Sequence, residues 1–320
     1  MLNRRILRIK VFKVLYSYAE NRSLTLEEAM ASLEASCEAT RDLYLLLLSI
    51  AGPLTAQARR LVDAAMGKFN PTEADLNPSM NFVNNGLAPL LSEDPDFTKL
   101  ISKRHLEWDQ EDSLIRNLYN SIEGKDWFKA YQALPARSLK DDAALFRHIF
   151  TEEFEDNPAV EAVLEERSLY WKDELAYALN CVLHSLDDIA RTGRWTLPPL
   201  YNSDMLVERG VADADSDRDF SRRLLTAAFG RYEEYSAKVA ESVTRFDRDR
   251  LFTTDIVLIA LGLAEAEHFP EIPVKATINE YVEIAKYYST PKSAGFVNGL
   301  LDRLIRESME AGKIQKKGLN

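Results

Sequence analysis

Four residues near the C-terminal end of the sequence have the types and spacing of a surface that holds single-stranded RNA. Lys292, Phe296, Gly299 and Arg303 follow one another at intervals of four, three and four, so on a helix they share one face. RNA bases stack on aromatic rings while Lys and Arg hold the phosphates, and a glycine lets another backbone approach closely. The spacing leaves a second interpretation open, in which Phe296 is the edge of the core and the cations are solvated.

A second group of cations lies at the start of the chain. Residues 1–19 contain no acid and five basic residues, which are Arg4, Arg5, Arg8, Lys10 and Lys13. Apolar residues recur there with the helical period, so we expect a helix with one buried stripe flanked by the arginines. Basic N-termini are common, so RNA binding and simple solvation of the cations both stay open at this point.

Motifs of nucleotide, nucleophile and metal chemistry are absent from the sequence. No GxGxxG, GxxxxGK[ST], GxSxG or HExxH occurs, and the four histidines stand singly, without metal-ligand spacing. Adjacent acids such as Glu152 and Glu153 point about 100° apart on a helix, so a solvated face explains them better than acid–base catalysis. We therefore expect no catalytic residue, no metal and no cofactor.

Composition indicates an ordinary globular protein with an uneven distribution of charge. The chain has 320 residues, 46% of them hydrophobic, and a formal net charge of −11. Residues 1–19 carry +5, residues 20–215 carry −16, and residues 216–320 are neutral. This asymmetry allows a local site for a polyanion while the acidic bulk discourages non-specific binding. With two cysteines, no signal-peptide pattern and no apolar run of membrane-spanning length, we expect a cytoplasmic protein.

The apolar periodicity predicts an all-α protein built from several parts. Residues 1–19 form the first helix, and residues 20–190 form an acidic helical part. Residues 191–217 are rich in turn-forming and acidic residues and read as a linker. Residues 218–312 form a C-terminal helical bundle, and a basic tail follows at 313–320.

Three helices of the predicted bundle position the candidate residues. Residues 220–243 are predicted to form one helix. Residues 256–264 are apolar on all sides and are predicted to form the central buried helix. Thr254 and Asp255 are expected to cap that central helix. Thr290 and the proline after it are expected to begin the last helix, which carries the cationic stripe beside its apolar face.

Three segments of the sequence resemble the family of the transcription antitermination factor NusB. Residues 3–8, NRRILR, look like the arginine-rich opening helix of that family. Residues 272–286, IPVKATINEYVEIAK, resemble its strongest signature, and residues 293–302, SAGFVNGLLD, follow at the family's spacing. The resemblance covers residues 1–19 and about 216–308, roughly a third of the chain.

The resemblance implies a NusB-like helical bundle, here with a large inserted helical subdomain, and a function without catalysis. Members of the family pair with NusE, a small-subunit ribosomal protein. The pair binds boxA-type single-stranded RNA on nascent transcripts, chiefly of rRNA operons. It thereby acts in the antitermination complex of RNA polymerase.

The resemblance also implies roles for individual residues. In the family the arginine-rich helix and the Phe of the FVNG segment contact RNA, and the matching residues here are Arg4, Arg5, Arg8 and Phe296. Lys292 stands where many relatives have an acid, which favours RNA binding. Asp255 matches an acidic position that faces NusE. Glu265 is retained in the same helix and is carried over as a second partner-binding residue.

The sequence departs from the family in two places. Ala260 and Ala264 stand where relatives usually have Arg and Tyr, so the contacts of those side chains are not carried over. Residues from about 20 to 215 replace a much shorter segment, and their charge disfavours direct contact with RNA. An alternative hypothesis is a holder of NusE, or an adaptor in ribosome assembly, that acts through this acidic insertion without binding RNA. An RNA methyltransferase is disfavoured, because no glycine-rich strand–turn–helix supplies a cofactor site.

Overall fold

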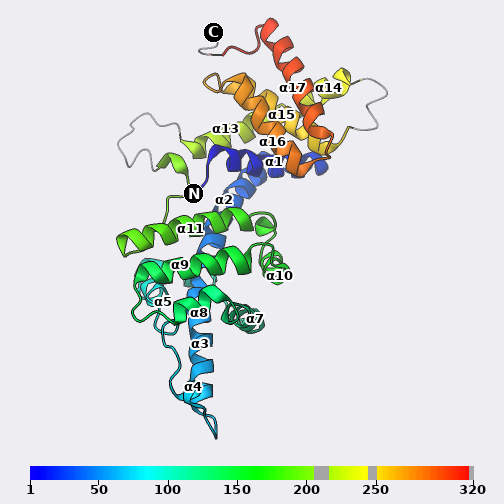
Figure 1. Cartoon of the computed structure of the whole chain (residues 1–320). Coiled ribbons are helices and arrows are strands. Elements are labelled where there is room, and N and C mark those ends of the chain that lie inside the picture. The colour runs from blue at the N-terminus through cyan, green and yellow to red at the C-terminus, as the bar shows by residue number, and fades with distance from the viewer. Residues whose placement is uncertain (205–215, 244–250, 317–320) are drawn as a thin grey trace. The chain divides into compact units, whose positions relative to one another are not determined.

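The computed structural model describes residues 1–204, 216–243 and 251–316. These residues form helices and no β-strand (Figure 1), which confirms the predicted all-α class. Parts of the predicted linker 191–217 and of the predicted tail 313–320 lie outside the described residues. None of the described helices is both long enough and apolar enough to span a bilayer.

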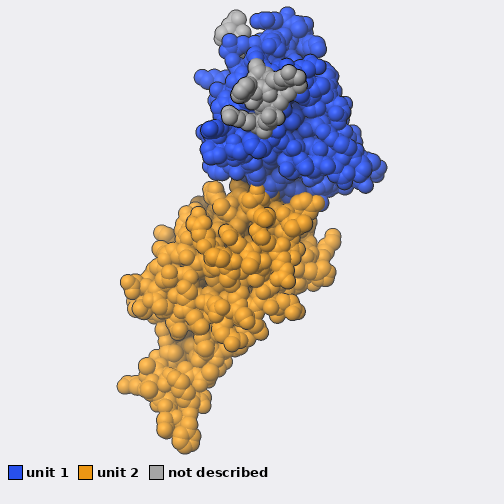
Figure 2. Space-filling model, turned by 90° about the vertical axis from the view of Figure 1, so that its right-hand side faces the viewer, with its two compact units in different colours: residues 1–37, 199–320 blue, residues 38–198 orange. Residues whose placement is uncertain are grey.

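The chain divides into two compact units (Figure 2). Unit 1 consists of residues 1–37 and 199–320, and unit 2 consists of residues 38–198. Unit 2 is therefore an insertion in the sequence of unit 1. The first boundary falls inside one helix, α2 (Leu26–Ser49).

Unit 1 is a bundle of helices gathered around α15 (Figure 1). Besides the first part of α2, its helices are α1 (Arg4–Glu20), α13 (Asp217–Gly230), α14 (Tyr232–Ser242), α15 (Thr253–His268), α16 (Val274–Tyr288) and α17 (Ser293–Glu310). Helix α15 packs against α1, α13, α14, α16 and α17, and every residue from 257 to 266 is buried. The sequence predicts this central helix because its apolar residues occupy all sides.

Several helix boundaries in unit 1 differ from the predictions. The single helix expected over 220–243 is two helices that meet at Arg231, whose backbone leaves the helical region and whose guanidinium binds Glu234 at 2.8 and 2.7 Å. Helix α17 begins at Ser293 and not at the predicted Thr290 cap, because the Thr290 hydroxyl bonds the Ser293 hydroxyl instead. Helix α15 begins at Thr253 without the predicted side-chain cap.

Unit 2 is a second helical bundle with an aromatic core of its own. Besides the end of α2, its helices are α3 (Ala51–Met66), α4 (Glu73–Leu76), α5 (Leu87–Ser92), α6 (Pro95–Arg104), α7 (Asp112–Glu123), α8 (Asp126–Gln132), α9 (Leu139–Ile149), α10 (Pro158–Arg167) and α11 (Leu175–Thr192). A π-helical turn, η1 (Phe150–Phe154), follows α9, and a 3₁₀ turn, η2 (Leu169–Trp171), follows α10. Phe82 is fully buried, with its ring 5.3 Å from that of Phe128 and 5.9 Å from that of Phe146.

Candidate nucleic-acid interface

Arg5 is the residue of the N-terminal cluster that reaches solvent most fully. Asn3 caps α1 by accepting a hydrogen bond from the backbone N–H of Ile6, so the helix begins at the arginines. The Arg5 guanidinium donates two hydrogen bonds of 2.8 Å to the Glu280 carboxylate on α16, and 53% of its side chain is exposed. The hydrogen bond from Arg5 holds the pKa of Glu280 below its ordinary value. An ion pair this exposed stabilises the fold by about 0–1 kcal/mol.

Arg4 contacts α13, whereas the neighbouring Arg5 contacts α16. Its Nε donates a hydrogen bond of 3.1 Å to Asp217 at the start of α13, and its guanidinium carbon lies 5.1 Å from the centre of the Phe220 ring. Asp217 also accepts a hydrogen bond of 3.0 Å from the backbone N–H of Ser203. The first turn of α1 therefore connects to α13 through Arg4 and to α16 through Arg5.

Arg8 and Glu265, predicted to bind RNA and a protein partner respectively, are buried and bind each other. Arg8 donates hydrogen bonds of 2.7 and 2.9 Å to the Glu265 carboxylate, which also accepts from Thr277 at 2.8 Å and from Tyr281 at 3.1 Å. Burial lowers the pKa of Arg8, but the hydrogen bonds to Glu265 and the nearby negative charges together outweigh this effect and raise the pKa overall. Burial and the Glu265 charge raise the pKa of Tyr281. In this arrangement neither Arg8 nor Glu265 presents its charge to a ligand.

Asp255, the other predicted partner-binding residue, is also buried. Its carboxylate accepts hydrogen bonds from the hydroxyls of Ser289 at 2.7 Å and Ser293 at 3.0 Å. Burial raises the pKa of Asp255, although the two serine hydrogen bonds oppose the shift. The carboxylate thus joins the start of α15 to the turn between α16 and α17.

The C-terminal stripe lies on the solvent side of α17, as the sequence spacing predicts. Lys292, Gly299 and Arg303 are exposed and Phe296 is half-buried. Arg303 donates a hydrogen bond of 2.6 Å to the backbone carbonyl of Ser242, at the end of α14. Apart from the backbone of its own helix, a Cβ at Gly299 would meet no atom within 4 Å, so this side of the helix is open.

The structure also contains an aromatic group that the sequence analysis does not assign to the site. Phe12 on α1 is buried, with its ring 5.3 Å from that of Tyr288 at the end of α16 and 6.2 Å from that of Tyr16. The Lys13 ammonium lies 5.8 Å from the centre of the Tyr288 ring, and 36% of Tyr16 is exposed. The spacing of four between Phe12 and Tyr16 could have indicated half of this group, whereas Tyr288 is too distant in sequence to be found in that way.

The structure therefore divides the predicted residues into two sets. Arg5 holds α1 to α16, and α16 packs along α17, which carries the exposed stripe. The buried set holds the bundle together and consists of Arg8, Asp255 and Glu265. Lys10, another cation of α1, is also buried and donates a hydrogen bond of 2.8 Å to the Ser36 carbonyl.

Comparison with known proteins identifies the same part of the molecule. Residues 202–306 match the model of the NusB family. The chain is 31% identical over 113 residues to the transcription antitermination protein NusB of Salinibacter ruber, covering 35% of this chain and 71% of that protein. The chain belongs to the NusB family. It is also 32% identical over 111 residues to the NusB of Thermodesulfovibrio yellowstonii, covering 34% of this chain and 74% of that protein.

A third NusB, from Chloroherpeton thalassium, is 32% identical over 114 residues, which is 36% of this chain and 54% of that protein. No solved structure matches the chain. NusB proteins are transcription antitermination factors and not enzymes, so the predicted family and the predicted non-enzymatic character are confirmed. The family match lies within unit 1, and unit 2 lies outside it.

Proposed function

We propose that this protein is an antitermination factor that pairs with NusE and binds boxA-type RNA. The RNA is the nascent transcript, chiefly of rRNA operons, and the complex acts on RNA polymerase in the cytoplasm. Membership of the NusB family supports the general role. The observation that carries the RNA-binding part is the exposed stripe on α17, where Phe296 stands between Lys292 and Arg303.

The proposed RNA-binding face combines the α17 stripe with the first turn of α1. Phe296 offers a ring edge for stacking, and the flanking cations neutralise phosphates. Arg5 is bound to Glu280 only through an exposed pair, so a phosphate can replace that carboxylate at little cost. Gly299 leaves room for the RNA backbone.

We assign positioning roles to the buried residues of the predicted site. Arg8 holds α1 against α15 and α16 through Glu265, and so fixes the first turn from which Arg5 projects. Asp255 fixes the turn that leads into α17 and therefore the position of Lys292. In this proposal Asp255 and Glu265 shape the surface that NusE contacts without touching NusE themselves.

Fluorescence anisotropy with a labelled boxA-like RNA and a scrambled control, each with and without purified NusE, tests the proposal. We expect sequence-dependent binding that NusE strengthens. Phe296→Ala should weaken binding by about 1–3 kcal/mol, because one stacked base is lost. Phe69→Ala is the matched control, because Phe69 is 99% exposed and lies in unit 2, outside the family match. Equal affinity of wild type and Phe296→Ala, with NusE binding intact, would reject this RNA face.

A second candidate function is a holder of NusE, or an adaptor in ribosome assembly, that acts through unit 2. The observation that favours it is charge: residues 38–198 contain 17 basic and 27 acidic residues, and ribosomal proteins are basic partners. Replacing the exposed Glu161, Glu165 and Glu166 of α10 by Gln in the full chain discriminates between the two functions. If the variant loses NusE binding and the wild type does not bind RNA, the adaptor function is favoured.

A further inference from the structure

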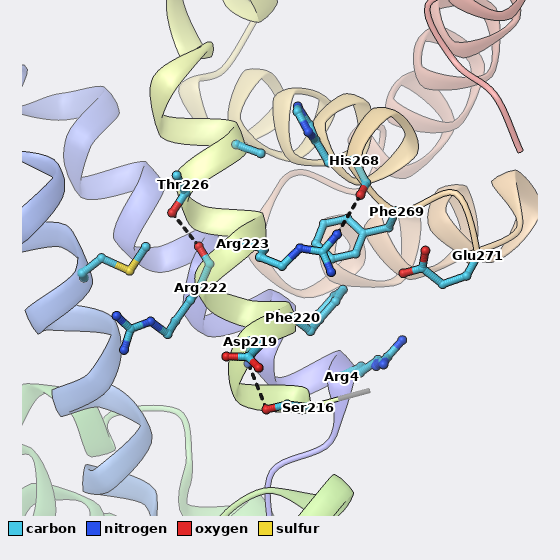
Figure 3. Close-up of a pocket in the computed structure, with 12 residues that line it drawn as sticks. Arg4, Ser216, Asp219, Phe220, Arg222, Arg223, Thr226, His268, Phe269 and Glu271 are labelled. Atoms are coloured by element: carbon cyan, nitrogen blue, oxygen red, sulfur yellow. Dashed lines mark hydrogen bonds between the residues drawn. The ribbon is translucent and has the colours of Figure 1, made fainter. Parts of the chain in front are cut away.

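A hollow of about 610 Å³ opens in unit 1 beside α13 (Figure 3). Half of its lining residues come from α13, and the others come from the segment before α13, the start of α1, α2, and the end of α15 with the turn after it. Arg4, Phe220, Arg223, Phe269 and Glu271 line it and are drawn together in Figure 3. None of these residues except Arg4 belongs to the RNA-binding face proposed above.

Two buried aromatic rings orient two guanidinium groups in this hollow. The rings of Phe220 and Phe269 are 5.0 Å apart, and only 3% and 1% of these residues are exposed. The guanidinium carbon of Arg4 lies 5.1 Å from the Phe220 ring centre, and that of Arg223 lies 4.7 Å from the Phe269 ring centre. A guanidinium placed over a ring keeps its N–H groups at its edges, where they can donate to a phosphate. The rings thus fix the positions of both guanidinium groups at the hollow.

Arg223 differs from its neighbour in its charge partners. Arg222 points away from Arg223 in Figure 3 and forms an ion pair with Glu34 at 2.5 Å. Arg223 instead donates a hydrogen bond of 3.2 Å to the backbone carbonyl of His268, and among the described residues no carboxylate lies within ion-pair distance of it. Its positive charge is therefore available to a ligand. Asp219 and Glu271 also line the hollow and oppose an anion there.

We propose that this hollow binds the phosphates of an RNA segment that flanks the boxA-type element. The inference rests on the proposed RNA-binding function and extends it. Arg4 and Arg5 are consecutive, and they contact α13 and α16 respectively. An RNA strand that crosses the first turn of α1 from the α17 stripe therefore reaches Arg4 and then Arg223. The bound RNA is longer than the segment that the stripe alone contacts.

Two labelled RNAs measured with the full chain test this inference. One has about 12 nucleotides and contains the boxA-like element alone, and the other has about 24 nucleotides, with flanks on both sides. Wild type should bind the longer RNA more tightly. Arg223→Gln should weaken binding of the longer RNA about three- to tenfold, reduce its salt slope by about 0.7, and change binding of the shorter RNA less than twofold. Arg191→Gln, an exposed change of the same charge in unit 2, should change neither affinity.

A substitution of opposite sign in the same hollow gives an independent readout. Glu271→Gln removes a negative charge that faces the proposed phosphates, so it should strengthen binding of the longer RNA about two- to threefold. Glu310→Gln, an exposed change on α17, is the control and should have no such length-dependent effect. Circular dichroism and NusE binding of each variant verify that the fold is retained.

The outcomes separate this inference from the proposed function. The hollow is not an RNA site if wild type binds both RNAs equally and if Arg223→Gln and Glu271→Gln do not change either affinity. That result would not contradict the proposed boxA-binding face. Failure of wild type to bind either RNA overturns the proposed function and the inference together. If Arg223→Gln weakens binding of both RNAs equally, the inference is also overturned, because the variant then acts only through the overall charge of the protein.

Discussion

At the scale of single residues, burial determines which arginines of α1 can act on a ligand. Glu265 is fully buried and receives four hydrogen bonds, two of them from Arg8. Charges taken out of water are tolerated only when they are paired and hydrogen-bonded. Removal of one member leaves the other charge buried without its partner. Arg5, by contrast, forms its ion pair with Glu280 at the surface, where its side chain is 53% exposed.

The two arginines should therefore differ in their effect on stability. We expect Arg8→Ala to lower the free energy of unfolding by about 3–5 kcal/mol, because it leaves the Glu265 carboxylate buried and uncompensated. Arg5→Ala should lower it by less than about 1 kcal/mol, since the Glu280 carboxylate remains solvated. Urea denaturation followed by far-ultraviolet circular dichroism measures both values, and similar values for the two variants would contradict the assignment.

The Arg5–Glu280 pair also predicts a dependence on pH. Because its hydrogen bond to Arg5 lowers the pKa of Glu280 from the ordinary 4.5, the pair contributes stability above that value. The contribution is lost as the pH falls through the lowered folded-state pKa. The stability difference between wild type and Arg5→Ala should therefore shrink in acid. A carboxyl NMR titration should place Glu280 below 4.5 in wild type and higher in Arg5→Ala, whereas Asp255, whose pKa burial raises, should not move.

Residue spacing predicted where the exposed candidate residues lie better than where the buried ones lie. The intervals among Lys292, Phe296 and Arg303 are local on one helix, so the structure places them as expected. Arg8 and Glu265 are 257 positions apart, and no local pattern indicates that they pair. The sequence identifies the Arg8 charge but not the carboxylate that holds it.

At the scale of helices, two glycines act in opposite ways. A Cβ on Gly262 of α15 would lie 2.6 and 2.8 Å from the methyl carbons of the buried Leu301, so α17 approaches the α15 backbone closely there. We expect Gly262→Ala to destabilise the protein by about 1–3 kcal/mol through overpacking. Gly299→Ala meets open space and should stabilise α17 by about 0.5–1 kcal/mol. Thermal unfolding of both variants measures the contrast.

Anisotropy with the boxA-like RNA tests the role of Gly299 separately from its effect on stability. If the RNA backbone approaches Gly299, as we propose, Gly299→Ala gives a protein that is more stable and binds RNA more weakly. If Gly299→Ala is more stable but binds RNA with unchanged affinity, Gly299 is not part of the proposed RNA-binding face.

Helix identity was more predictable than helix ends. The all-round apolar pattern correctly predicted α15 as the central helix. The sequence did not predict the end of α13, because the apolar pattern continues through Arg231. Arg231 bonds Glu234 on α14 and Glu267 on α15, and only its bond to Glu267 joins two different helices beyond this junction. The start of α17 was misplaced because Thr290 bonds a serine side chain and not a helix N–H. Specific side-chain bonds, most of them local, therefore accompany the boundaries that the apolar pattern did not predict.

At the scale of the whole molecule, the two units differ in their spectroscopic residues. All four tryptophans lie between residues 108 and 195, within unit 2, so tryptophan fluorescence reports that unit alone. Each unit has its own core, so we expect Arg8→Ala to shift the circular dichroism transition while the fluorescence transition stays in place. Equal shifts in both signals would show that the units unfold as one.

The distribution of charge predicts the response of RNA binding to salt. If the face neutralises about three to five phosphates, the logarithm of the binding constant should fall with the logarithm of salt concentration at a slope of roughly −2 to −3.5. A titration of boxA-like RNA at several potassium chloride concentrations measures this slope. A flat response would exclude a role for the cationic first turn.

The insertion of unit 2 between the two segments of unit 1 has a consequence for synthesis of the chain. Helix α1 ends at Glu20, but its partner α13 begins only at Asp217. At roughly 5–20 residues per second, a ribosome needs about 10–40 s to make the residues between them. Through this interval the apolar side of α1 has left the ribosome before α13 and α15 have been made. We therefore expect a nascent chain of this protein to offer chaperones a long-lived apolar binding site on α1.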